Sequence, residues 1–168
     1  MPTQEIRFFG DPVLVTPAAL VIDFDNEIRT LISDLTQTML DAPGAGLAAP
    51  QIGVPLRAFV WHVNDELGHL INPTLVLSGE TEIDDEGCLS FPELTFPTPR
   101  SIRAVARGFN MYGQPCSGRG AHLVYLAKQT DRDSGEAIRR RRDRLLLHRT
   151  VEQKEAGLCF TSRTTPPD

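Results

Sequence analysis

The chain has 168 residues, the size of one ordinary domain with a sizeable core and too short for two comfortable ones. Hydrophobic residues make up 40% and charged residues 23%, the formal net charge is −5, and no apolar run is long enough to span a bilayer. The composition therefore argues against a membrane-spanning chain, and no membrane partner is expected.

The start of the chain and its cysteines bear on its compartment. Met1 to Arg7 lack the basic segment, apolar stretch and cleavage site of a secretory signal, so we expect a cytoplasmic protein. Three cysteines, Cys88, Cys116 and Cys159, form an odd set without Cys-x-x-Cys spacing. This pattern argues against a disulfide framework or a self-contained zinc knuckle, and favours a thiol with local chemistry at Cys88.

The first predicted element is a helix over residues 26–40. Asp25 or Asn26 can cap it, and Pro43 with Gly44 ends it. Apolar residues with helical spacing define its buried face: Ile28, Leu31, Ile32, Leu35 and Met39.

The string Gly-Ala-Gly-Leu-Ala-Ala-Pro-Gln follows at residues 44–51. Glycines let the backbone approach a ligand closely, and Gln51 offers an amide that can donate to a developing oxyanion. The plainer interpretation is a turn after the helix followed by ordinary core residues.

Strands are expected next, at residues 56–63, at 70–77 with a bend at Asn72-Pro73, at 80–84 and at 101–111, before a turn at 113–115. His62 and His69 bracket an apparent loop at residues 64–68, where a solvated surface role is expected. One early helix packed with short, mostly antiparallel strands predicts an α+β fold.

A second string, Glu-Gly-Cys-Leu-Ser, occupies residues 86–90. A lone cysteine is most often a small buried hydrophobe, so Cys88 is informative only in combination with other signals. The two strings in this order, with Ile71-Asn72-Pro73 between them, resemble the first two motifs of the peptide deformylase family. The resemblance covers about residues 5–115.

The resemblance implies an α+β metalloenzyme that removes the formyl group from the initiator methionine of nascent polypeptides, with ferrous ion, or nickel or zinc in its place. It implies Cys88 as the thiolate ligand, and Gln51 with the backbone N–H of Leu89 as donors to the oxyanion. Gly44 and Gly46 would line the substrate. The implied partners are N-formylmethionyl nascent peptides, and we expect a monomer.

The family's third motif, Gln-His-Glu-x-x-His on a C-terminal helix, does not occur in this sequence. Counted without gaps from His122, it would fall on residues 129–134, where Thr130 and Ser134 replace both histidines and Asp131 replaces the glutamate general base. Hydroxyl groups are poor replacements for imidazole on such a metal.

The composition changes abruptly near residue 116. Residues 1–116 hold six Lys or Arg against fifteen Asp or Glu, whereas residues 117–168 hold eleven against seven. We therefore predict a deformylase-like domain over 1–116 and a divergent, basic, partly disordered segment over 117–168. Residues 136–147 could be helical on propensity alone. The run Arg139 to Arg142 is usually a solvated patch; a contact with the ribosome surface is the alternative, and no specific nucleic acid is expected.

Several hypotheses remain open from the sequence. The chain is a deformylase-type hydrolase, or an inactive relative that binds formyl-peptides or a partner, or its end after residue 116 results from a changed reading frame. A small α+β binding module with a basic tail ranks below these three, because two separate motifs occur in the right order.

Overall fold

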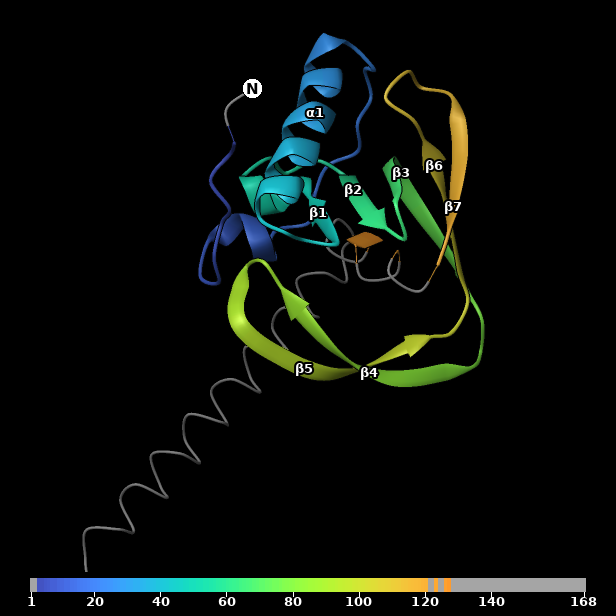
Figure 1. The fold of residues 1–168 in the computed structure, drawn as a ribbon. Coiled ribbons are helices and arrows are strands. Elements are labelled where there is room, and N and C mark those ends of the chain that lie inside the picture. The colour runs from blue at the N-terminus through green and yellow to red at the C-terminus, as the bar shows by residue number, and fades with distance from the viewer. Residues whose placement is uncertain (1–2, 121–122, 124–125, 128–168) are drawn as a thin grey trace, which may run out of the picture.

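The computed structural model describes residues 3–120 together with Leu123, Leu126 and Ala127. Within these residues, helix α1 (Asn26–Asp41) is followed by strands β1 (Gly46–Ala48) to β7 (Pro115–Arg119), and the short 3-10 helices η1 (Pro12–Val15) and η2 (Ala49–Ile52) lie before α1 and after β1. Figure 1 shows α1 lying along one side of a sheet, with a separate pair of strands below it. The predicted α+β fold is confirmed.

The predicted helix forms where its periodicity placed it. The Asp25 carboxylate caps α1 by accepting from the N–H groups of Glu27 and Ile28. The five apolar residues that defined its face are all buried. At its end, the N–H of Gly44 donates to the carbonyl of Met39.

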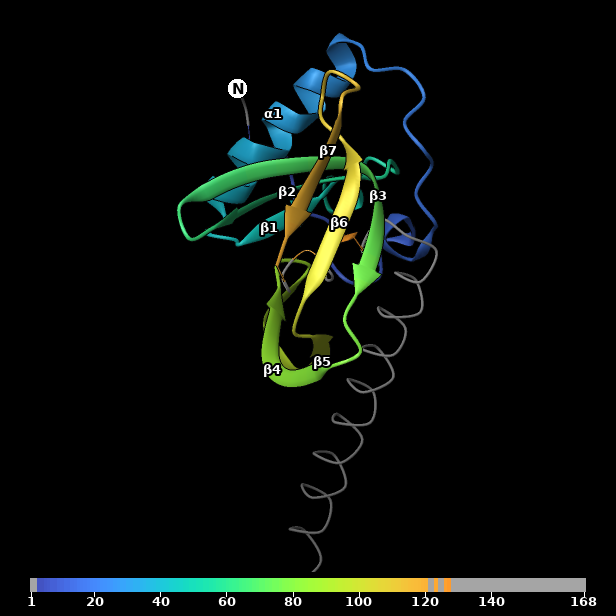
Figure 2. The ribbon, with the colours of Figure 1, turned by 90° about the vertical axis from the view of Figure 1, so that its right-hand side faces the viewer.

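The larger sheet has five antiparallel strands in the order β1-β2-β3-β6-β7. Its strands are β1 (Gly46–Ala48), β2 (Ala58–Val63), β3 (Glu66–Leu77), β6 (Ala104–Phe109) and β7 (Pro115–Arg119). Figure 2 shows β6 lying between β7 and the end of β3.

The hairpin between β2 and β3 has a two-residue turn, because Asn64 and Asp65 both take positive φ, 53° and 62°. Positions 66–69 therefore belong to β3. The surface role expected for His69 is wrong: it is half-buried, and its Nε2 accepts from the N–H of Met111 at 3.0 Å. His62 is exposed.

The predicted bend in β3 is confirmed. The register with β6 shifts between Ile71 and Thr74, and Asn72 has φ 51°. The Asn72 side chain is held from outside the strand, because Oδ1 accepts from Val21 N–H at 2.9 Å and Nδ2 donates to the Val21 carbonyl at 2.8 Å.

The second sheet contains β4 (Thr81–Cys88) and β5 (Phe91–Ser101). The sequence predicted only residues 80–84 as the first of these and missed β5, which contains Pro92, Pro97 and Pro99. Prolines cannot donate to a sheet, but among the described strands β5 pairs only with β4 and therefore needs few donors. The single strand expected at 101–111 is wrong, because Ser101 ends β5 and β6 begins at Ala104.

Two clusters of buried side chains lie on the two faces of the larger sheet. Successive residues of β2 point to opposite faces: Ala58 and Val60 belong to the cluster under α1, and Phe59 belongs to the cluster on the other face. Leu123, Leu126 and Ala127 complete the second cluster. Of the described helices, none is long and apolar enough to cross a membrane.

Three predicted features lie outside the described residues: the helix at 136–147, the segment 129–134 with Asp131, and the polar end of the chain. The predicted division at residue 116 stays a prediction.

Candidate functional site

Gln51 occupies the centre of the candidate site and is 1% exposed. Its Oε1 accepts from the N–H of Ala48 at 3.0 Å, which orients the side-chain amide. Its Nε2 then donates to Ser90 Oγ at 3.2 Å and lies 3.8 Å from Cys88 Sγ. The structure thus brings together the ends of two strings that are 37 residues apart in the chain.

The local backbone geometry explains the position of the Gln51 side chain. The chain leaves β1 at Ala48 and turns at once into η2, with Pro50 in its first turn. Gly53 ends η2 with φ 84°, a conformation that glycine adopts at little cost. The N–H of Arg7 donates to the Gln51 carbonyl at 2.7 Å, so the main chain of Gln51 is also held.

Cys88 is the last residue of β4 and is half-buried, packed against the cluster of Leu14 and Phe91. The register of β4 and β5 is irregular between Gly87 and Cys88, as in a β-bulge, and Leu89 with Ser90 makes the turn. Within the described part of the chain, the N–H of Leu89 has no acceptor. This leaves one backbone donor next to the thiol.

The two glycines of the first string leave space for specific neighbours. A Cβ on Gly44 would lie 2.7 Å from Leu89 Cδ1, and a Cβ on Gly46 would lie 2.5 Å from Leu126 Cδ1. Gly44 therefore lets the first string approach the second. Gly46 faces a leucine side chain at the position where the resemblance implies substrate.

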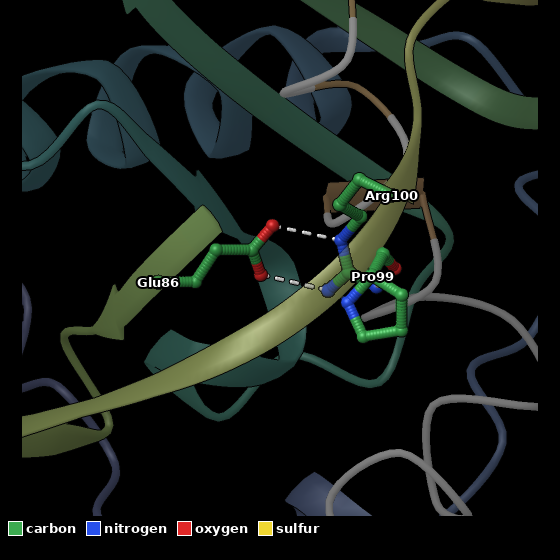
Figure 3. A network of polar contacts seen from close by, with 3 residues as sticks. All are labelled: Glu86, Pro99 and Arg100. Atoms are coloured by element: carbon green, nitrogen blue, oxygen red, sulfur yellow. Dashed lines mark hydrogen bonds and ion pairs between the residues drawn. The ribbon is translucent and has the colours of Figure 1, made fainter. Parts of the chain in front are cut away.

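Sequence reasoning missed one ion pair beside the site. Figure 3 shows the Arg100 guanidinium bound by the Glu86 carboxylate through two parallel bonds, Nε to Oε1 at 2.8 Å and Nη2 to Oε2 at 2.7 Å. The side chains are 14% and 22% exposed. Glu86 lies opposite Phe96 in the register and Arg100 lies opposite Glu82, so strand order alone does not signal this pair.

The described residues do not supply a complete metal site. Among them, no three His, Cys, Asp or Glu side chains gather closely enough to hold an ion. Cys88 is the one member of the expected ligand set that the structure describes. Cys116 packs in the other cluster, with Phe59, and burial raises the pKa of its thiol, so it gives Cys88 no second thiolate.

Comparison with known proteins connects this geometry to one family. The family model for polypeptide deformylase matches residues 3–145, a range that crosses residue 116. A peptide deformylase of Acidothermus cellulolyticus is 50% identical over 172 residues, covering 99% of this chain and 96% of that protein. Peptide deformylase 1 of Corynebacterium glutamicum is 39% identical, covering 85% and 89%.

Solved structures agree in fold. The peptide deformylase of Thermotoga maritima superposes with a TM-score of 0.75 at 34% identity, covering 78% of this chain and 93% of that one. The peptide deformylase of Legionella pneumophila gives a TM-score of 0.74 at 29% identity, covering 89% and 98%.

Proposed function

The chain belongs to the peptide deformylase family, and from this membership we propose that it binds N-formylmethionyl peptides at the site formed by Gln51, Cys88 and Leu89. Peptide deformylases hydrolyse the N-formyl group from the initiator methionine of nascent polypeptides. The observation that carries the proposal is the orientation of the Gln51 amide, whose Nε2 faces Cys88.

Two donors in this site suit a formyl oxygen. Gln51 Nε2 is buried and oriented by the bond from Ala48 to Oε1, and the N–H of Leu89 has no acceptor within the described residues. Donors held in place before the ligand arrives stabilise developing charge without reorganisation. Gly44 and Gly46, with no side chains of their own, are the residues we propose to lie along the peptide backbone.

The site is less well equipped for hydrolysis than for binding. The family chemistry uses ferrous ion or a substitute such as nickel or zinc, and we propose Cys88 as the thiolate ligand. The described residues add no imidazole to it, and the sequence has Thr130 and Ser134 where the family motif has histidines. Asp131 would take the position of the general base. We therefore propose that this chain binds formyl-peptides and deformylates them far more slowly than a relative with both histidines.

The binding half is tested with a formylated and an acetylated methionyl tripeptide, titrated calorimetrically against the native chain. Gln51→Glu keeps an oxygen for Ala48 N–H and removes the donor, so its affinity for the formyl-peptide should fall by about tenfold or more. Gln37→Glu, on the exposed face of α1, is the matched control and should bind as the native chain does. Equal binding of the formyl-peptide by both variants would refute the proposal.

The hydrolytic half is tested by restoring the motif with the triple variant Thr130→His, Asp131→Glu and Ser134→His. Anaerobically purified, this variant should bind ferrous or nickel ion at near-equimolar stoichiometry, and Cys88→Ser should abolish that binding. Its deformylation rate should exceed that of the native chain by about a hundredfold or more. A native chain that already holds equimolar metal and hydrolyses as fast as the triple variant would show that another ligand set exists.

Location and assembly follow from the same proposal. We propose a cytoplasmic monomer that meets nascent chains as they are synthesised, with Arg139 to Arg142 contacting phosphate on the ribosome surface. Co-sedimentation with ribosomes at low and high salt tests the contact. Replacing the four arginines by serine should remove the low-salt binding, and retained binding would contradict this assignment.

A further inference from the structure

A groove of about 640 Å³ lies between the segment before α1 and the first half of that helix. Residues 20–23 and 25 form one side, residues of α1 between Asn26 and Asp34 form the other, among them the buried Ile28 and Leu31, and Val54 and Leu56 complete the lining. None of the groups assigned to the formyl-peptide site takes part in it. The groove therefore needs an explanation of its own.

The segment that forms one side is held to the sheet by its main chain. The N–H of Ala19 donates to the Pro55 carbonyl at 2.8 Å, and the Ala19 carbonyl accepts from Arg57 N–H at 2.9 Å. The main chain of Val21 is held to β3 in a similar way, because its N–H donates to Asn72 Oδ1 and its carbonyl accepts from Asn72 Nδ2. The segment is thus fixed in an extended form, and the groove does not depend on a ligand to open it.

This fixed backbone exposes two large apolar side chains. Val21 points inward and is 5% exposed, so alternation along the extended segment turns Leu20 and Ile22 outward, where they are 59% and 84% exposed. Within the described residues, the N–H and carbonyl groups of Leu20 and Ile22 have no hydrogen-bond partner. A polypeptide in extended form could use both the side chains and these backbone groups.

All charged residues that line the groove are acidic, while the Arg29 guanidinium donates to Asn26 Oδ1 and to the Phe24 carbonyl beside it. Asp23, Asp25, Glu27 and Asp34 line the groove, and no Lys, Arg or His is among the lining residues. Asp25 is engaged in capping α1, and Asp34 accepts from Gln4 Nε2 at 3.1 Å. Asp23 and Glu27 have no partner in the described part of the chain. An apolar groove with uncompensated carboxylates favours an occupant that carries both aliphatic and cationic side chains.

We propose that this groove docks an extended segment of a basic protein in which large aliphatic residues alternate with lysine or arginine. Its aliphatic side chains cover Leu20 and Ile22, and its cations lie beside Asp23 and Glu27. The surface is separate from the formyl-peptide site, so a protein bound here leaves Gln51 and Cys88 free.

The test uses the full chain and a short acetylated peptide of alternating lysine and leucine, with binding measured by fluorescence anisotropy. Two matched peptides replace lysine by glutamate or leucine by serine. The lysine–leucine peptide should bind, more weakly as salt rises, and both matched peptides should bind at least about tenfold more weakly. Failure of the lysine–leucine peptide to bind, or equal binding of the glutamate–leucine peptide, would overturn the proposal.

Variants locate the binding. Leu20→Ser with Ile22→Ser should lower affinity by about tenfold or more, as should Asp23→Asn with Glu27→Gln. Two control variants, Leu67→Ser with Val76→Ser and Glu66→Gln with Glu82→Gln, alter exposed positions outside the groove and should leave the affinity unchanged. Unchanged binding by the groove variants would place the peptide on another surface and overturn the proposal.

Sedimentation of the native chain tests the alternative that the groove binds a second copy of this chain. Self-association that Leu20→Ser with Ile22→Ser abolishes would assign the groove to a second copy and overturn the proposal.

Discussion

At Gly46, the absence of a side chain leaves room for a packing contact. The space a Cβ would need is occupied by Leu126, at 2.5 Å from Cδ1 and 2.7 Å from Cδ2. Gly79 offers a comparison, because a Cβ there would meet no atom within 4 Å. The first glycine is required by a contact with a residue 80 positions away in the sequence, and the second is not required by any contact.

We predict that Gly46→Ala lowers the free energy of unfolding by about 1–3 kcal/mol, because the added methyl group overpacks against Leu126. Gly79→Ala should change it by less than about 0.5 kcal/mol. Urea denaturation followed by circular dichroism measures both. Adding Leu126→Ala to Gly46→Ala should cost less than the sum of the two single changes, and strict additivity would mean that the two residues do not meet.

His69 shows how burial selects a protonation state. Its Nε2 accepts from the N–H of Met111, which requires an unprotonated nitrogen, and burial lowers the pKa of His69 below its ordinary value of 6.5. The unfolded chain therefore takes up a proton at a higher pH than the folded chain does. The contribution of His69 to the free energy of unfolding is fully present above pH 6.5, the ordinary pKa that it has in the unfolded chain. This contribution is lost as the pH falls through the lowered pKa of the folded state.

We predict that the urea midpoint of the native chain falls between pH about 7.5 and about 5, and that His69→Gln removes part of this fall. Glutamine keeps an acceptor for Met111 and does not titrate. His62→Gln, at an exposed position on β2, is the control and should leave the pH dependence unchanged. If His69→Gln and the native chain show the same dependence, other groups account for it.

The ion pair between Glu86 and Arg100 links the two strands of the β4–β5 hairpin. In the part of the chain that the structure describes, the strands of both residues pair only with each other, so the five-stranded sheet gives this hairpin no strand neighbour. The two-bond geometry is specific to arginine and a carboxylate, and both side chains are less than a quarter exposed. Because Glu86 is two residues before Cys88, the pair holds the end of β4 that carries the thiol.

We predict that Arg100→Met lowers the free energy of unfolding by about 2 kcal/mol, since it leaves the Glu86 carboxylate partly buried without its cation. It should also raise the rate at which a thiol reagent modifies Cys88. Adding Glu86→Gln should recover part of the loss. Glu82→Gln, exposed on the same strand, is the control and should alter neither measurement. An unchanged modification rate in Arg100→Met would limit the pair to a role in stability.

At the scale of the whole molecule, the five-stranded sheet separates two clusters of buried residues. The cluster under α1 comes from residues 21–71, whereas the opposite cluster needs Leu123, Leu126 and Ala127 to cover Phe59 and Leu70. Leu123 is fully buried, and a Cβ on Gly118 would lie 2.8 Å from its Cδ1. The chain after residue 120 thus supplies part of the core.

We predict that Leu123→Ala lowers the free energy of unfolding by about 2–5 kcal/mol, through lost burial and a cavity next to Phe59. Leu67→Ala, at a leucine that is 55% exposed on β3, should cost less than about 1 kcal/mol. Thermal and urea unfolding of the two variants measure the difference. Equal effects would mean that Leu123 does not belong to the core in solution.

By itself, the sequence determined the features that rest on local interactions: α1 from its spacing and cap, the bend at Asn72, the α+β class and the two strings that mark the family. Near neighbours in the chain set backbone preference and periodicity, so these features are visible without coordinates. The missing histidine motif is likewise a property of the sequence.

Only the tertiary structure decided the features that join distant residues. It orients Gln51 toward Cys88, pairs Glu86 with Arg100 across an offset register, half-buries His69 beside Met111 and places Leu126 against Gly46. It also accommodates three prolines in β5, which local propensity reads as loop. The physical reason is common to all of them: each depends on contacts whose partners are distant in the chain, and these exist only once the sheets have formed.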